Sequence, residues 1–335
     1  MYFLILLFFL PAECMNIVVP ISSAKVLLFF EICKFICSCA KKILLLHAEM
    51  NTIGQILRFT DFGESHGVAV GGVLDGVPSQ LQINFDAIQY DLDRRAGRIG
   101  DLVVSERAQA EADEIEWLSG LLDGVTLGTP IAFIIRNTNA RPEDYEALKD
   151  VYREGHADKV YEQKYGIRDY RGGGRASARE TVARVVAGSI AKQILAKDDI
   201  RIEGQLVQIG DETDPNKFAS LLEAVKQAGD SVGGVVECRI KGLNAGVGEP
   251  IFDKLQARLA YAIMSINGCR SFEYSSGIVG GISDGKDIVF RCRFKATATK
   301  MKEFGGRHDV CIAVRAVPIV EAMTALTICD LKQVL

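Results

Sequence analysis

The sequence predicts an α+β fold. Apolar runs rich in Val, Ile and Gly are mixed irregularly with amphipathic helical patterns, without the regular alternation of a doubly wound parallel sheet. The chain has 335 residues, is 48% hydrophobic and 24% charged, and carries a net charge of −4. This composition is typical of a globular protein with a sizeable core, and it excludes disordered, collagenous and disulfide-framework chains. It gives no general argument for a nucleic-acid or membrane partner.

Strands are predicted where β-branched residues and glycines form short apolar runs bounded by turn residues. These runs cover residues 68–74, 130–136, 202–209, 232–240, 288–295 and 311–315. Helices are predicted over residues 85–96, 177–196, 217–228, 254–266 and 317–331. In the second helix, apolar residues recur at helical spacing and form one stripe, and in the last helix Pro318 fits the first turn. No repeat or long linker divides these elements, so we expect one domain over residues 50–335.

The first 49 residues differ in composition from the rest of the chain. They contain 35 apolar residues, no Gly and four of the nine Cys, whereas all 32 Gly follow them. The segment has neither the basic residues that begin a secretion signal nor a cleavage site with small residues. A membrane-spanning helix would be interrupted by Pro11, Glu13, Pro20, Glu31 and Lys34. We therefore expect residues 1–49 to be a hydrophobic extension outside the fold, with Met50 as the working start. A membrane anchor and a secretion signal are the alternatives.

The five remaining cysteines are scattered, without the paired spacing of a metal site or a disulfide framework. We expect them to be small buried residues of a protein in a reducing compartment, which favours a cytoplasmic location and no bound metal.

Three of the four histidines lie in polar segments bounded by glycine or charged residues. His66 follows Gly63-Glu64-Ser65, His156 follows Gly155, and His308 stands between Arg307 and Asp309. Turns expose side chains and let a ligand approach the backbone closely. Imidazole is also the side chain best suited to proton transfer near neutral pH. A structural role and a role in proton transfer both remain open for each histidine at this point.

Arginine is concentrated around a triple glycine that opens a predicted helix. Five arginines fall between Arg168 and Arg184, around Gly172-Gly173-Gly174, with Ser177 at the helix start. Free N–H groups at a helix N-terminus and bidentate guanidinium groups both favour an anion such as phosphate or carboxylate. A second cluster is formed by Arg94, Arg95, Arg98 and Arg107. It could bind an anion, but a solvent-exposed helix end explains it equally well. Together these features predict a small, multiply anionic ligand and proton transfer.

At these positions the chain resembles the chorismate synthase family. Three long motifs stand in order, GESHGVAVGGVLDGVP from Gly63, GGGRASARETVARVVAG from Gly172 and GRHDVCIAVRAVPIVEAM from Gly306. The resemblance extends from Met50 to about Ala325. It implies a β-α-β sandwich with a helical layer between two sheets, and assembly as a homotetramer without a nucleic-acid or membrane partner.

The resemblance also implies an activity. Enzymes of this family convert 5-enolpyruvylshikimate 3-phosphate to chorismate and phosphate by an anti-1,4-elimination, a step of the shikimate pathway toward aromatic amino acids. The reaction has no net redox change, yet it requires reduced FMN (FMNH2), because a reduced flavin can lend electron density to the substrate and recover it. Whether an external reductase or NADPH supplies the reducing equivalents stays open.

Site residues follow from the same motifs. His66 resembles the histidine that protonates the reduced flavin, and His156 the one that assists the leaving phosphate. Asp309 resembles the acid that handles the substrate proton, with Ser65 and Ser177 as supporting hydrogen-bond groups. The resemblance implies flavin contacts from Arg175, Ala176, Ser177, Asn267, Gly268, Gly280, Lys295, Ala296, Thr297, Ala298, Thr299 and Arg307. It implies substrate contacts from Arg95, Arg98, Arg153 and Arg179.

The chain departs from the family pattern in two short connections. The segment between Asn267-Gly268 and Gly280, which helps to close the flavin site, is shortened, and so is the segment between Thr299 and Gly306. A weaker closure would admit water and loosen positioning. The alternative function is therefore an impaired family member or gene-model fragment that acts at most as a protein binding FMN or a phosphorylated ligand.

Overall fold

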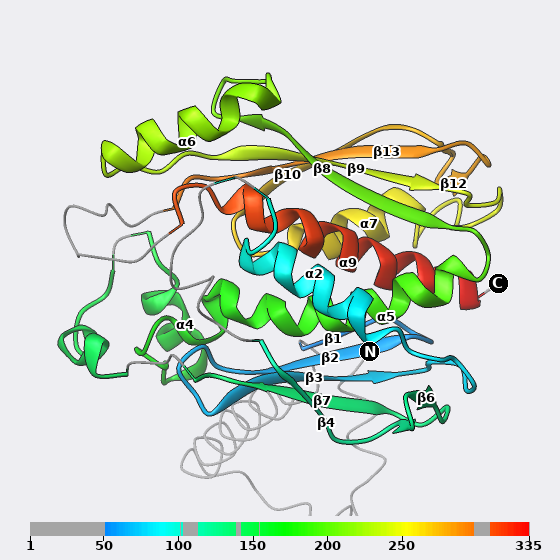
Figure 1. Cartoon of the computed structure of the whole chain (residues 1–335), viewed down its shortest axis with the longest axis horizontal. Coiled ribbons are helices and arrows are strands. Elements are labelled where there is room, and N and C mark those ends of the chain that lie inside the picture. Colours follow the sequence, from blue (N-terminus) through cyan, green and yellow to red (C-terminus); the bar gives the residue numbers. More distant parts are fainter. Residues whose placement is uncertain are drawn as a thin grey trace, which may run out of the picture. The chain divides into compact units, whose positions relative to one another are not determined.

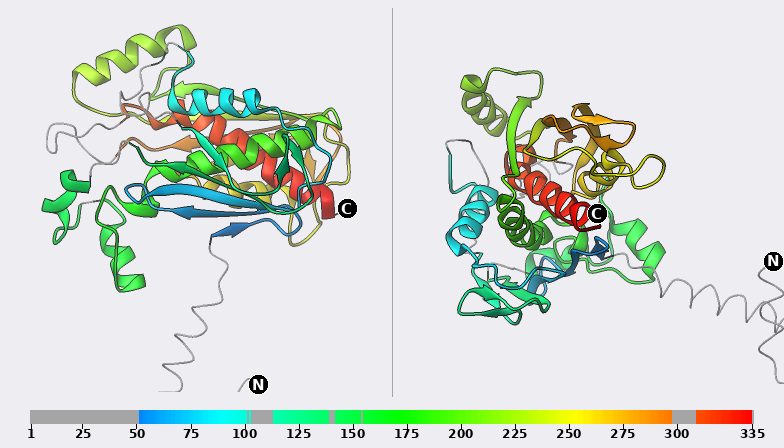
Figure 2. Two further views of the ribbon diagram at one scale, coloured as in Figure 1. Left: turned by 60° about the horizontal axis from the view of Figure 1, so that its bottom comes forward. Right: turned by 90° about the vertical axis from the view of Figure 1, so that its right-hand side faces the viewer.

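The computed structural model describes residues 51–100, 102, 113–138, 142–153, 155–297 and 309–334. These residues form a layer of helices between two antiparallel sheets, as Figure 1 shows with one sheet above the helices and one below. The right-hand view in Figure 2 again shows helices between the two sheets. The predicted α+β sandwich is therefore confirmed. The hydrophobic extension at residues 1–49 lies outside the described residues.

The first sheet is built from the N-terminal part of the domain. Its strand order is β1 (Thr52–Ile53), β2 (Arg58–Gly63), β3 (Ala69–Asp75), β7 (Ile131–Arg136) and β4 (Ile115–Trp117), all antiparallel. Alternate side chains along these strands point to one face of the sheet, and this face is buried in the core. The side chains include Phe59, Val70, Leu74, Phe133 and Ile135.

The second sheet comes from the C-terminal half. Its order is β10 (Cys269–Ser276), β13 (Ile288–Phe294), β9 (Gly234–Lys241) and β8 (Arg201–Ile209), again antiparallel. Val236, Cys238, Ile240, Phe290 and Cys292 of the two central strands are buried. The cysteines of the described residues are free thiols, and all are buried as predicted except Cys269, which is half-buried.

The middle layer consists of α2 (Phe85–Ala96), α5 (Thr181–Ala196), α7 (Leu255–Met264) and α9 (Ile312–Val334). Helix α2 has the predicted bounds because both of its ends are marked in the sequence. The Asn84 side chain accepts a hydrogen bond from the Ala87 N–H at 3.0 Å, and Gly97 ends the helix in the left-handed conformation with φ +69°.

Helices α5 and α9 cross at a glycine. A Cβ atom placed on Gly188 of α5 would lie 2.2 Å from the Cβ atom of Ala322 on α9. Only the absence of a side chain lets the two backbones approach this closely. Both helices are apolar on nearly all sides, as expected for a layer covered by sheets on both faces.

Helix α9 corrects the sequence interpretation. The predicted strand at 311–315 is wrong, because residues from Ile312 onward are helical, and Pro318 stands inside the helix rather than in its first turn. Pro318 removes one backbone donor, but the continuous burial of this apolar segment favours one long helix. By length and composition the helix could span a membrane, yet 83% of its most apolar window is buried inside the protein, as in a core helix.

The remaining elements lie around this core. They are the helices α4 (Asp158–Tyr165) and α6 (Phe218–Gln227), and the hairpins β5 (Leu121–Leu122) with β6 (Val125–Thr126) and β11 (Ile278–Val279) with β12 (Ile282–Ser283). Single turns of 3-10 helix cover Pro142–Leu148, Gly174–Ala176, Ala178–Glu180 and Pro215–Lys217. Two of these turns precede α5, which therefore begins four residues later than the predicted residue 177.

We predict that Gly188→Ala destabilises the protein. Glycine to alanine inside a helix usually stabilises by up to about 1 kcal/mol. Here the added methyl group meets Ala322 and must push the two helices apart, which costs about 1–3 kcal/mol. The free energy of unfolding from urea denaturation measures the sign. A variant as stable as the parent, or more stable, would contradict the close crossing.

Candidate active site

The triple glycine forms a turn that no other residue type would adopt easily. Gly172, Gly173 and Gly174 have φ angles of +62°, +91° and +53°. A Cβ atom on Gly172 would lie 2.0 Å from Nδ1 of His66, and one on Gly173 would lie 2.7 Å from Cε1 of His156. Neighbouring Cα atoms are about 3.8 Å apart, so two imidazole rings from distant parts of the chain pack against one short stretch of backbone.

His66 stands in the turn between β2 and β3 and is buried. Its Nδ1 lies 3.1 Å from the hydroxyl oxygen of Ser65, and the Tyr145 ring meets it edge-on with centroids 4.7 Å apart. The amide of Asn137, just after β7, donates to the Glu64 carbonyl at 2.9 Å and fixes the turn to the sheet. The Ser65 hydroxyl thus fixes the orientation of the His66 ring through Nδ1.

His156 lies in the loop before α4 and pairs with a buried acid. Its Nδ1 is 2.9 Å from Oδ1 of Asp158, whose side chain is 2% exposed. Arg153 donates to the same carboxylate from Nε at 2.8 Å and from Nη2 at 2.9 Å. Asp158 thus holds the imidazole and the guanidinium together, and it leaves Nε2 of His156 beside Gly173.

The charges around His156 set its protonation. Burial, the Arg153 guanidinium and the Lys295 ammonium lower the pKa of His156, and the Asp158 carboxylate only partly opposes them. Burial would raise the pKa of Asp158, but hydrogen bonds from Arg153 and the nearby His156 lower it to about 2. The lowered pKa favours the neutral imidazole at pH 7, and its Nδ1 lies within hydrogen-bond distance of both the Asp158 carboxylate and the Arg153 guanidinium.

Several of the predicted flavin-contact residues come together beside the glycine turn. The Asn267 amide donates to the Ala176 carbonyl at 2.9 Å, and the Lys295 N–H donates to the Gly268 carbonyl at 3.0 Å. Ser177 accepts a hydrogen bond from the Arg179 N–H at 3.3 Å and caps the turn before α5.

The end of β13 also meets the start of α9 here. The Thr297 hydroxyl donates to the Asp309 carbonyl at 3.1 Å, and Asp309 Oδ2 accepts from Arg315 at 2.7 Å. Ala296 lies between Lys295 and Thr297 and its backbone approaches Gly233. Arg175 binds Asp61 through Nη1 at 2.8 Å.

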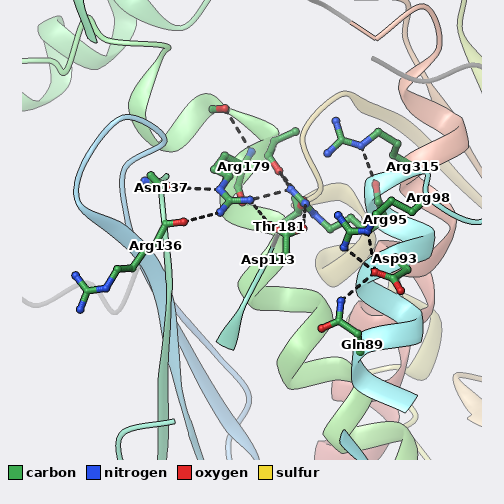
Figure 3. A network of polar contacts seen from close by, with 12 residues as sticks. Gln89, Asp93, Arg95, Arg98, Asp113, Arg136, Asn137, Arg179, Thr181 and Arg315 are labelled. Atoms are coloured by element: carbon green, nitrogen blue, oxygen red, sulfur yellow. Dashed lines mark hydrogen bonds and ion pairs between the residues drawn. The ribbon is translucent and has the colours of Figure 1, made fainter. Parts of the chain in front are cut away.

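Two predicted substrate arginines converge on one buried acid, Asp113 (Figure 3). Arg179 lies 2.5 Å from its Oδ1 and Arg95 3.5 Å from its Oδ2. Arg95 is 1% exposed and also donates to the Ala178 carbonyl at 3.0 Å, beneath the turn that leads into α5. Arg98 binds Asp93 on the outside of α2, with N–O distances of 2.9 and 2.6 Å.

Some predicted residues are not brought to this place. Gly280 lies in the hairpin between β11 and β12, and β10 separates it from Gly268 by eight residues, or roughly 25 Å of strand. Ala298, Thr299 and Arg307 lie outside the described residues, as does His308.

Sequence analysis missed the acids that organise the site. Asp113, Asp158, Asp61 and Glu180 are buried and each pairs with a cationic side chain. Only Asp158 carried a local signal, because it follows His156 by two residues.

The donor set suits an anionic ligand. Lys295 is half-buried, and among the described residues its ammonium group has no ion-pair or hydrogen-bond partner, although its charge acts on His156. A half-buried cation beside a neutral imidazole attracts a phosphate group, so these residues fit a phosphorylated cofactor or substrate.

Comparisons with known proteins identify the family of this chain. The family model described as chorismate synthase matches residues 57–278 and 273–332. The chorismate synthases of Christiangramia forsetii and Flavobacterium psychrophilum are 42% and 41% identical, each over 84% of this chain and 96% of the relative. A solved structure titled "Crystal Structure of Chorismate Synthase" is 27% identical with a TM-score of 0.67, covering 83% of this chain and 92% of that one.

The same comparisons indicate that this chain lacks part of the length of its relatives. The alignment with the first of these relatives runs over 344 positions but uses 84% of the 335 residues here, so about 60 positions have no counterpart. The family model matches in two pieces that meet at residues 273–278, where β10 runs directly into the β11–β12 hairpin. With the motifs, the three-layer fold and these matches in agreement, the chain belongs to the chorismate synthase family of lyases.

Proposed function

We propose that this chain catalyses the 1,4-elimination of phosphate from 5-enolpyruvylshikimate 3-phosphate to give chorismate. The observation that carries the proposal is the pair of imidazoles, His66 and His156, on one glycine turn. The Lys295 ammonium, whose charge acts on His156, has no ion-pair partner among the described residues. A phosphate that leaves needs a proton and cations, and both are present beside Gly173. The acidic protein thus concentrates positive charge only where a substrate trianion would bind.

Reduced FMN is the proposed cofactor, as it is for the family in general. When bound, it supplies electron density to the substrate and recovers it, which explains a flavin requirement without net redox change. The segments Arg175 to Ser177, Asn267-Gly268 and Lys295 to Thr297 would hold it, since they are the ones joined beside the turn. NADPH is a proposed source of the reducing equivalents.

The two histidines have separate proposed roles in proton transfer. His66 would carry a proton on Nε2 for exchange with the flavin, while the Ser65 hydroxyl orients the ring through Nδ1. His156 would give a proton from Nε2 to the leaving phosphate, because an approaching dianion raises its lowered pKa and protonates the ring. Asp309 would accept the substrate proton, with Arg315 holding its Oδ2.

Among the proposed substrate contacts, Arg153 is the best placed because it lies against His156. The guanidinium groups of Arg95 and Arg179 are bound to Asp113 and to backbone carbonyl groups. A substrate carboxylate would have to displace these acceptors in order to bind the two arginines. We propose that these two mainly hold the turn before α5, and that Arg98 contributes after release from Asp93.

We further propose that residues 50–335 form the family domain, and that the chain works in the cytoplasm as a homotetramer. The family match beginning at residue 57 supports this domain boundary.

An impaired enzyme that only binds FMN is the second candidate, and the missing segment after β10 favours it. Anaerobic incubation with reduced FMN and 5-enolpyruvylshikimate 3-phosphate separates the two. The proposed function requires chorismate and phosphate in equal amounts. FMN binding without either product would support the second candidate.

We predict that His66→Ala lowers kcat by about 10²–10⁴-fold and leaves KM nearly unchanged, because a proton-transfer group is lost and the cationic contacts remain. Steady-state kinetics under anaerobic conditions measure both constants. Turnover equal to that of the parent protein would remove the assigned role.

We predict that Gly173→Ala lowers kcat about 100-fold. The methyl group would lie 2.7 Å from the His156 ring and must displace it, and a shift of about 1 Å can cost that much in rate. Gly166→Ala is the matched control, because Gly166 has a similar φ of +77° but no atom within 4 Å of the added Cβ. Both variants should lose about 1–2 kcal/mol of stability from backbone strain. Equal effects on kcat would show that strain alone is responsible.

A further inference from the structure

Two buried carboxyl groups lie together directly behind the glycine turn. Asp61 is on β2 and is 6% exposed, and Glu180 ends the 3-10 turn before α5 and is 2% exposed. Neither takes part in the chemistry proposed above. Each of the two pairs with an arginine, but a buried carboxylate costs free energy when one of its oxygens accepts no hydrogen bond.

The contacts of this carboxyl pair are unequal. Arg184 Nε donates to Glu180 Oε2 at 2.8 Å and lies 3.4 Å from Asp61 Oδ2, while Arg175 Nη1 donates to Asp61 Oδ1 at 2.8 Å. The other oxygen of Glu180, Oε1, is buried and has no hydrogen-bond partner among the described residues. A protonated Glu180 carboxyl group could donate a hydrogen bond to the neighbouring Asp61 carboxylate.

The electrostatics agree with a protonated Glu180. Burial, followed by the hydrogen bond and charge of Asp61, raises the pKa of Glu180 to about 8, although Arg184 and Arg175 act in the opposite direction. The charge of Glu180 also acts on Tyr161 of α4, whose hydroxyl pKa is raised mainly by burial. At neutral pH the four side chains Asp61, Glu180, Arg175 and Arg184 then carry one net positive charge.

The cluster also reaches the segments proposed to hold the flavin. Arg184 Nη1 donates to the Ser265 hydroxyl at 2.8 Å, two residues before Asn267, whose amide holds the Ala176 carbonyl. Arg175, itself a proposed flavin contact, also donates to the Gly63 carbonyl at 3.1 Å. A change of charge within the cluster therefore acts on both sides of the turn.

We propose that Glu180 is a positioning residue that shares one proton with Asp61, and that this proton keeps the Arg175–Arg184 cluster positively charged for binding the anionic flavin. The inference rests on the proposed function for the identity of the anion. Loss of the proton above neutral pH makes the cluster electrically neutral and weakens the hold on FMN.

The test is the affinity for oxidised FMN, measured by quenching of flavin fluorescence between pH 6.5 and 9.5. The full chain should lose affinity on the order of fivefold as the pH rises through about 8, because one charge near the anion is lost. In Glu180→Gln the side-chain amide can still donate a hydrogen bond to Asp61 but does not titrate in this pH range. The affinity of this variant for FMN should therefore not show the fall near pH 8. Glu203→Gln, at an exposed ion pair with Lys241, is the matched control and should keep it. A step that survives in Glu180→Gln, or no step in the parent chain, would overturn the proposal.

A second measurement does not need FMN. The infrared band of a protonated carboxyl group should be present in the parent chain at pH 6.5, disappear by pH 9.5 and be missing in Glu180→Gln. In Asp61→Asn the like charge is gone, so Glu180 should lose its proton at a lower pH. An absent band, or one unchanged by both substitutions, would refute the shared proton. Failure of the parent chain to bind FMN at all would instead count against the proposed function.

Discussion

The site depends on glycine at positions 172 and 173, because only a residue without a Cβ atom lets the two imidazole rings pack against the backbone there. Each glycine leaves room for one imidazole ring, and the left-handed backbone turns the chain so that rings from residues 66 and 156 meet it. The turn is supported by buried Arg95, which donates to the Ala178 carbonyl from α2, and by Asn267, which donates to the Ala176 carbonyl. Elements from the helical layer and both halves of the chain thus fix one short piece of backbone.

Charge pairing explains how an acidic protein can hold an anionic substrate. The arginines predicted to bind substrate already have acids beside them, with Asp113, Asp93 and Asp158 as partners. These pairs orient the guanidinium groups and keep them from repelling one another. Lys295 differs, since its charge meets no acid among the described residues. A ligand phosphate would therefore be attracted first to the Lys295 side of the turn.

Sequence reasoning succeeded where the signals are local. Asn84 and Gly97 mark both ends of α2, and the glycine-flanked histidines pointed to the turns where they lie. It failed where tertiary burial decides. The Val- and Ile-rich start of α9 has the pattern of a strand, but burial between the two sheets stabilises it as a helix. The polar strand β10 has no strand pattern in the sequence. The pairing of Asp113 with Arg179, 66 residues away, has no local signal at all.

The proposed chemistry depends on the histidine pair together with Arg153 and Lys295. Histidine side-chain NMR of the full chain, recorded with and without inorganic phosphate, probes these residues. We expect His156 to titrate below the ordinary histidine pKa in the free protein, and we expect phosphate to raise this pKa. A His156 resonance with an ordinary pKa that phosphate does not move would rule out the proposed arrangement of charges.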